Sequence, residues 1–221
     1  MDGSLKFSAL KEKQRAIRAG FPETMGLRVH RAISWVGRSE ACDGDDDARF
    51  LFLWIAFNAA YANDLGDGDR LHEKQAFGQF LDKLVELDSA DTLYKLIWTE
   101  FPGSIRVLLK NHYVFEPFWD FNRGKIGEEE WRGPFEWANK ASCQALAEHH
   151  TTATLSIVLA RMYTLRNQLI HGGSTWGSKV NRDQLRDCVD FLSKLVPHVI
   201  VLMLDNPNTL WGEACYPVVE V

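Results

Sequence analysis

The sequence has few features of secreted, metal-binding or membrane proteins. Its cysteines, Cys42, Cys143, Cys188 and Cys215, are widely scattered and form no C-x2-C pair. Neither a zinc site nor a disulfide framework is therefore indicated, and we expect buried free thiols. Polar residues interrupt every apolar run before it reaches the about 20 residues that a membrane-spanning helix needs, and no signal-peptide pattern is visible. We expect a cytoplasmic protein that does not associate with a membrane.

The composition predicts one compact domain. At 221 residues, with a hydrophobic share of 46%, eight Trp and thirteen Phe, the chain can bury a core without disulfides or a metal. The formal net charge of −5 argues against a general nucleic-acid binder. The segment 161–186 is nevertheless net positive, because five cations accompany Asp183 as its single acidic residue: Arg161, Arg166, Lys179, Arg182 and Arg186. A solvated helix face is the alternative interpretation of this charge.

Apolar residues recur at steps of three and four, which predicts an all-α fold: an antiparallel helical bundle. The expected helices are 21–38, 50–61, 70–87, 91–100, a short one carrying Arg106 and His112, 138–150, 151–170 and 181–204. We treat 1–221 as a single domain with an N-terminal arm (1–20), an aromatic-rich irregular insertion (101–137) and an extended C-terminal tail (206–221). Packing of the aromatic rings in the core is favoured over stacking on RNA bases.

Asn58 is the one strongly polar residue in the apolar run from Phe50 to Tyr61. A buried amide must find hydrogen-bond partners, so its position predicts a specific polar contact in the core. A packing or loop-capping role is the simpler alternative.

The strongest functional signal is the stretch from Arg166 to Gly173, with the sequence RNQLIHGG. A guanidinium can hold phosphate oxygens through several donors, and an imidazole titrates near neutrality and can move a hydroxyl proton. Residues five apart on a straight helix are separated by about 140 degrees. We expect Gly172 to end the helix in a left-handed conformation, which frees His171 to turn back toward Arg166.

The spacing alone is a weak signal, since Arg106 and His112 also fit it, without an Asn after the Arg or a glycine pair after the His. A further alternative is structural: His171 interacting with the helix dipole, and Arg166 paired to an acidic neighbour. His149 and His150 are adjacent and point apart, with no further ligand at suitable spacing. We therefore predict no metal site.

The pattern Arg166-Asn167-x3-His171 resembles the Arg-x4-6-His motif of HEPN domains, in the form where a polar residue follows the Arg. The run from Phe52 to Tyr61 is similar to the preceding helix of the Apea-like branch of that superfamily. The resemblance implies a helical bundle, usually a homodimer, in which two motifs face a shared cleft. It also implies a metal-independent endoribonuclease that needs no cofactor, with RNA as the substrate.

By this resemblance His171 is the general acid/base for attack of the ribose 2′-OH, which leaves a 2′,3′-cyclic phosphate, and Arg166 binds the scissile phosphate. Asn167 contacts the substrate or orients the histidine, and Asn58 supports the site. The cationic residues of the positive segment are expected to bind substrate: Arg161, Lys179 and Arg182.

A role as toxin or antiviral effector is consistent with the resemblance, with an antitoxin or regulatory protein as a partner. The competing function is a non-catalytic HEPN module for protein assembly or for RNA or nucleotide binding. A metal-dependent helical hydrolase would need Glu-x2-His spacing, which the expected central helices lack.

Overall fold

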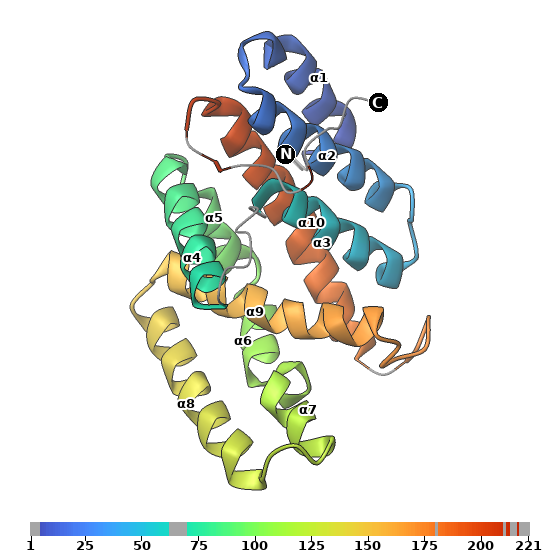
Figure 1. Ribbon diagram of the computed structural model, residues 1–221, viewed down its shortest axis with the longest axis vertical. Coiled ribbons are helices and arrows are strands. Elements are labelled where there is room, and N and C mark those ends of the chain that lie inside the picture. Colours follow the sequence, from blue (N-terminus) through green and yellow to red (C-terminus); the bar gives the residue numbers. More distant parts are fainter. Residues whose placement is uncertain (1–4, 62–69, 180, 210, 213–215, 217–221) are drawn as a thin grey trace. The chain divides into compact units, whose positions relative to one another are not determined.

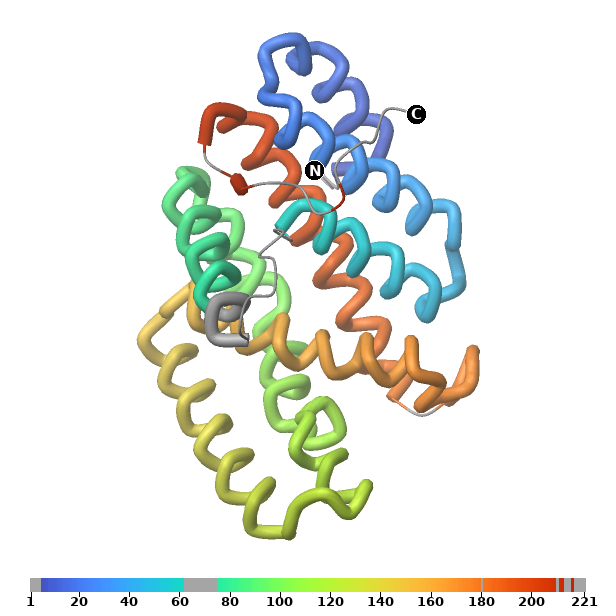
Figure 2. Tube along the Cα trace, viewed as in Figure 1, coloured from blue at the N-terminus to red at the C-terminus, as the bar shows by residue number. Residues whose placement is uncertain are grey.

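The computed structural model describes residues 5–61, 70–179, 181–209, 211–212 and 216. Within these ranges all regular secondary structure is helical, which confirms the all-α prediction. The chain divides into two compact units: residues 1–92 with 188–221 form the first unit, and residues 93–187 form the second. Figure 1 labels the helices, and Figure 2 follows the chain through both units. None of the described helices is long and apolar enough to cross a membrane.

The first unit is built from four helices and most of a fifth: α1 Phe7–Ile17, α2 Glu23–Glu40, α3 Asp46–Tyr61, α4 Arg70–Leu87 and α10 Arg182–Asp205. α2 packs extensively against α3, and α1 lies against α2 (Figure 1). Completely buried side chains of α10, such as Val189, Val196 and Val199, recur at helical spacing, so this helix contributes a full apolar stripe to the core.

The second unit contains the candidate motif. Its elements are α5 Thr92–Lys95, a π-helical turn Leu96–Glu100, α6 Pro102–Lys110, a 3-10 turn His112–Val114, α7 Glu116–Asn122, α8 Glu128–Ala147 and α9 Thr151–Ile170. Both α6 and α8 contact α9, and α7 packs on α8. Buried residues of α9 include Leu155, Val158, Leu159 and Met162, which fix this helix in the core of the unit.

The aromatic segment is more helical than the sequence predicts. α8 begins at Glu128 and passes through Pro134, whereas we expected an irregular insertion up to Trp137 and a helix from Ala138. The start of α8 is stabilised because the Gly127 N–H donates to Glu130 Oε2 over 2.7 Å. Trp131 and Phe135 lie one turn apart and pack against the His112 ring, at 6.1 and 6.3 Å between centroids. Tertiary packing therefore outweighs the helix-breaking tendency of Pro134.

Three further expectations need correction. Asn58, whose amide we expected to be buried, is only half-buried on α3, and Ile55 on the same helix is 36% exposed. The segment 1–20, which we expected to be an arm, contains the helix α1. The ring of Phe7 on α1 packs closely on Gly37, since a Cβ added to Gly37 would lie 2.7 Å from that ring. Of the cysteines, Cys188 is buried, Cys42 is half-buried and Cys143 is exposed, while Cys215 lies outside the described residues.

Part of the C-terminal tail packs on the first unit. Trp211 is buried against the Phe80 ring, at 6.0 Å between centroids, and its indole N–H donates to the Asn206 carbonyl. Most of the tail beyond Trp211 lies outside the described residues. The prediction of a single domain over residues 1–221 stays a prediction.

Candidate functional site

The candidate site is formed at the C-terminal end of α9, where two glycines terminate the helix. The Gly173 N–H donates to the Gln168 carbonyl over 2.7 Å, and the Gly172 N–H donates to the Leu169 carbonyl over 3.3 Å. This pair of bonds is the Schellman arrangement. Gly172 adopts φ +69°, as the sequence predicts, and a Cβ on Gly173 would lie 3.0 Å from the Gln168 carbonyl oxygen. Both positions of the turn therefore favour glycine, the first for its φ and the second for the close backbone approach.

Asn167 connects the two proposed catalytic residues. Its side-chain Oδ1 accepts a hydrogen bond of 2.9 Å from Nη1 of Arg166, and its carbonyl accepts the N–H of His171 over 3.0 Å. The Arg166 side chain and the His171 backbone are thus both bonded to one residue in the last turn of α9.

Arg166 is a half-buried cation with unused donor capacity. Its Nε is buried and has no hydrogen-bond partner, and no described carboxylate forms an ion pair with it. The guanidinium carbon lies 5.8 Å from the centroid of the Tyr163 ring. The alternative in which an acidic neighbour neutralises Arg166 therefore has no support among the described residues. A buried donor without a partner is costly, and an anion at this position would satisfy it.

His171 caps α9 and is exposed, as are the residues from Gly172 to Gly177 that follow it. No described side chain forms a hydrogen bond with its ring. An imidazole in this position is accessible to a substrate and free to exchange a proton with it.

No family model, no curated protein and no solved structure matches the chain. The HEPN resemblance therefore rests on the motif Arg166-Asn167-x3-His171 and the run from Phe52 to Tyr61.

The structure places Arg161 in the interior of the second unit. Its side chain is 4% exposed, with the guanidinium carbon 4.6 Å from the Phe115 ring and 5.4 Å from the Phe135 ring. Desolvation lowers the pKa of Arg161 to about 10. Since it forms no ion pair with a described residue, its two cation–π contacts are the attraction that offsets this burial. Substrate binding by Arg161 stays a prediction.

The other predicted substrate-binding residues follow the exposed loop. Lys179 is exposed. Arg182 is half-buried, and its Nε and Nη2 donate to the Ser178 carbonyl over 2.9 and 2.8 Å. Arg182 therefore holds the end of the loop, and a contact with substrate stays a prediction for both residues. Asn58 belongs to α3 of the first unit, and its supporting role is likewise untested.

The rival pair differs from the candidate pair in its surroundings. α6 ends at Lys110, so His112 lies outside the helix that we expected to carry it. Its ring packs 4.7 Å from the Phe118 ring and 4.2 Å from the Tyr113 ring, centroid to centroid. Arg106 is exposed on α6. His112 thus belongs to an aromatic cluster, which favours Arg166 and His171 as the functional pair.

Sequence reasoning missed the apolar residues beside the motif. Tyr163 is 51% exposed, Ile170 is 49% exposed and Trp176 is 78% exposed. Tyr163 and Ile170 are seven residues apart, so they share a face of α9 with Arg166 and Asn167 between them. The helical spacing of residues around Arg166 could have predicted this face of α9. The sequence could not predict that Tyr163 and Ile170, at the two ends of the face, are exposed.

Proposed function

We propose that the chain is a metal-independent endoribonuclease of HEPN type. Arg166 binds the scissile phosphate and stabilises the charge that develops in the transition state. His171 takes the proton of the ribose 2′-OH as that oxygen attacks phosphorus, and the 5′-oxygen leaves, which produces a 2′,3′-cyclic phosphate. The substrate supplies its own nucleophile, so the residues of the motif suffice.

The main support for the proposal is the environment of the Arg166 guanidinium. A half-buried arginine that retains an unsatisfied Nε and has no described acidic partner is arranged to receive an anion. Asn167 holds the guanidinium by a single bond through Nη1. Other donors of the fork stay available for phosphate oxygens.

The proposal includes a homodimer in which α9 of one protomer faces α9 of its partner. One Arg166 and one His171 offer few contacts to a phosphate, whereas two motifs in a shared cleft would double them. The exposed Tyr163 and Ile170 are the apolar residues that such an interface would cover. A toxin or antiviral role, restrained by an antitoxin or regulatory protein, belongs to the same proposal.

The decisive test is cleavage of a mixed-sequence RNA by the purified chain in excess EDTA. We expect loss of full-length RNA and cyclic phosphate ends with the parent chain, and no cleavage with His171→Ala or Arg166→Ala. Arg106→Ala is the matched control, because Arg106 is exposed on α6 and belongs to the rival pair. It is expected to cleave at the parent rate.

The alternative function, a non-catalytic module for assembly or for RNA or nucleotide binding, predicts a different result. In that case the parent cleaves no RNA at high enzyme concentration and long incubation, while it still binds RNA or a nucleotide. A parent-like rate for His171→Ala would also contradict the proposed mechanism.

A further inference from the structure

A second concentration of positive charge lies between α1 and α2, in the first unit. Lys11 and Arg15 lie four residues apart on α1, and Arg18, three residues further on, caps its C-terminal end and begins a 3-10 turn. This spacing places the three cations on one side of the helix, and His30 on α2 faces them. Lys11 Nζ lies 3.1 Å from His30 Nδ1. We call these four residues the α1–α2 basic cluster.

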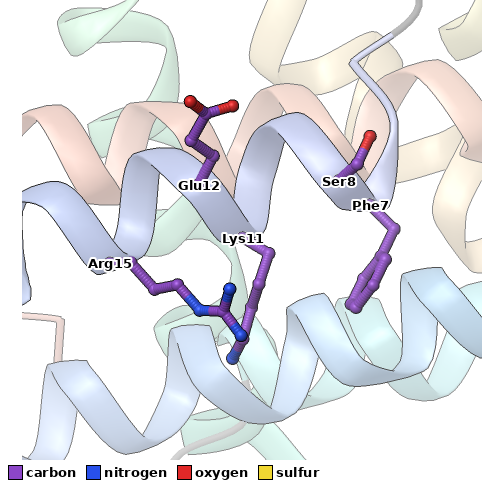
Figure 3. Close-up of a pocket in the computed structure, with 5 residues that line it drawn as sticks. All are labelled: Phe7, Ser8, Lys11, Glu12 and Arg15. Carbon is purple, nitrogen blue, oxygen red and sulfur yellow. The ribbon is translucent and has the colours of Figure 1, made fainter.

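Two members of the cluster, Lys11 and Arg15, line one of two surface pockets, and Figure 3 shows this lining. The side chains of Lys11 and Arg15 extend in the same direction from α1, whereas Glu12 points the opposite way. This pocket has a volume of about 440 Å³. The second, of about 370 Å³, is lined by Arg18 and His30 together with Gln14, Glu23 and apolar residues of α2 and the preceding turn. Since Lys11 lines one pocket and His30 the other, their contact links the two.

The members of the cluster destabilise one another's charged forms. Desolvation and then the charges of Arg15 and Arg18 lower the pKa of Lys11. Desolvation, followed by the charges of Lys11 and Arg18, lowers the pKa of His30. An ammonium and an imidazole at hydrogen-bond distance cannot both be protonated without strong repulsion. A bound anion would remove this repulsion and let all four groups carry a positive charge.

Nearby acidic residues do not neutralise the cluster. Glu40 accepts the Phe7 N–H over 2.7 Å, and Asp205 is paired with Lys13 at 2.6 Å. Glu12 lines the first pocket and Glu23 the second, but no ion pair joins either of them to a described cation. The charge of the cluster is therefore available to a ligand.

We infer that the α1–α2 basic cluster binds the polyphosphate group of a small molecule, such as a nucleoside diphosphate or triphosphate. Lys11 to Arg18 span about 10 Å of helix, which is long enough to contact more than one phosphoryl group. The two pockets have the size of small-ligand sites and contain apolar side chains beside the cations, including Phe7 and Phe21. Because the net charge of the chain is −5, the basic cluster is a local site and not part of an extended positive surface. A local site of this kind suits a compact anion.

The test measures binding of inorganic pyrophosphate and of ATP to the full chain by calorimetry at pH 7 and low salt, with adenosine as the uncharged comparison. We expect both phosphates to bind and adenosine not to bind. The double variant Lys11→Gln/Arg15→Gln should bind each phosphate at least about tenfold more weakly, since it loses two charge-assisted contacts.

Lys13→Gln is the control for loss of charge on α1, because it removes one positive charge from the same helix at a residue that is paired with Asp205 and lines neither pocket. It should bind both phosphates like the parent. The pKa of His30, followed by NMR, should rise when pyrophosphate is added. His171→Ala should also bind like the parent, so the result does not depend on ribonuclease activity.

Three outcomes would overturn the inference: no binding of pyrophosphate or ATP at millimolar concentration, equal binding by the parent and the double variant, or an equal loss of affinity in Lys13→Gln. Binding of single-stranded RNA at Lys11 and Arg15 without binding of pyrophosphate would also contradict it. That last result would assign the cluster to a nucleic-acid strand.

Discussion

Nη1 of Arg166 donates a 2.9 Å hydrogen bond to Oδ1 of Asn167, while the Asn167 carbonyl accepts the His171 N–H over 3.0 Å. The residue between the proposed phosphate-binding and proton-transferring groups thus holds the side chain of one and the backbone of the other. The sequence indicated only that a polar residue follows the arginine. This bond is the basis for the positioning role that we propose for Asn167.

We predict that Asn167→Ala lowers RNA cleavage by about 100-fold, because displacement of a positioned group by about 1 Å can have an effect of this size. The guanidinium loses its bond to Oδ1, whereas the backbone bond to His171 is retained, so the main effect should fall on kcat. Steady-state kinetics with a defined RNA would measure it. Gln168→Ala is the control. The neighbouring Gln168 side chain is also an amide, but it donates to the Tyr113 carbonyl, so its loss should change the rate little.

The turn after α9 gives a prediction about stability. Gly172 has φ +69°, so Gly172→Ala should lower the free energy of unfolding by about 1–2 kcal/mol. Gly78→Ala is the opposite case: Gly78 lies within α4 and a Cβ there meets nothing within 4 Å. That substitution should raise the free energy of unfolding by about 0.5–1 kcal/mol. Denaturant titration of both variants would check the signs, and stabilisation by Gly172→Ala would contradict the assigned turn.

Much of this turn could be predicted from the sequence, and the reason is local. The two glycines, the left-handed conformation of Gly172 and the end of α9 at Ile170 depend on residues adjacent in the chain. The end of α9 and the extents of α4 and α10 were predicted within a residue or two, because their apolar periodicity is regular.

The errors arise where distant residues decide the structure. Pro134 suggested a break in the chain, yet α8 continues through it, because Trp131 and Phe135 pack on a turn that lies about twenty residues earlier in the sequence. The burial of Arg161 is a second feature that distant residues decide. Its guanidinium lies over the rings of Phe115 and Phe135, and its expected contact with substrate stays a prediction.

Arg161 gives a prediction about pH. Burial disfavours the charged form of Arg161 and lowers its pKa to about 10. Below that pH the guanidinium is charged in both the folded and unfolded states. Arg161→Met should therefore be as stable as the parent or more stable at pH 8, since it removes a buried charge without an acidic partner. As the pH rises through about 10, Arg161 of the folded parent loses its proton, so the parent no longer buries a charge. The difference in free energy of unfolding between the variant and the parent should therefore be smaller than at pH 8.

Parallel denaturation of the parent and Arg161→Met at pH 8 and pH 10.5 would measure this difference, and comparison at each pH cancels the titration of groups common to both proteins. A large loss of stability in the variant at pH 8 would show that the ring contacts outweigh the desolvation cost. That result would contradict the prediction.

The exposed face of α9 leads to a prediction about assembly. Ile170 is 49% exposed and shares this face with Tyr163, so we expect a homodimer that buries both. Ile170→Asp would place a charge in that interface without a partner, and it should shift the chain from dimer to monomer. Because the composite cleft would be lost with the dimer, RNA cleavage should fall together with it. Val107→Asp is the matched control, since Val107 is 60% exposed on α6 and lies outside the proposed interface.

Light scattering with size-exclusion chromatography would measure the mass of the parent and of both variants across a range of concentrations. A parent that is monomeric at concentrations where it cleaves RNA would contradict the shared cleft, because one Arg166 and one His171 would then perform the reaction alone. A dimer that survives Ile170→Asp but dissociates in Val107→Asp would move the interface from α9 to α6.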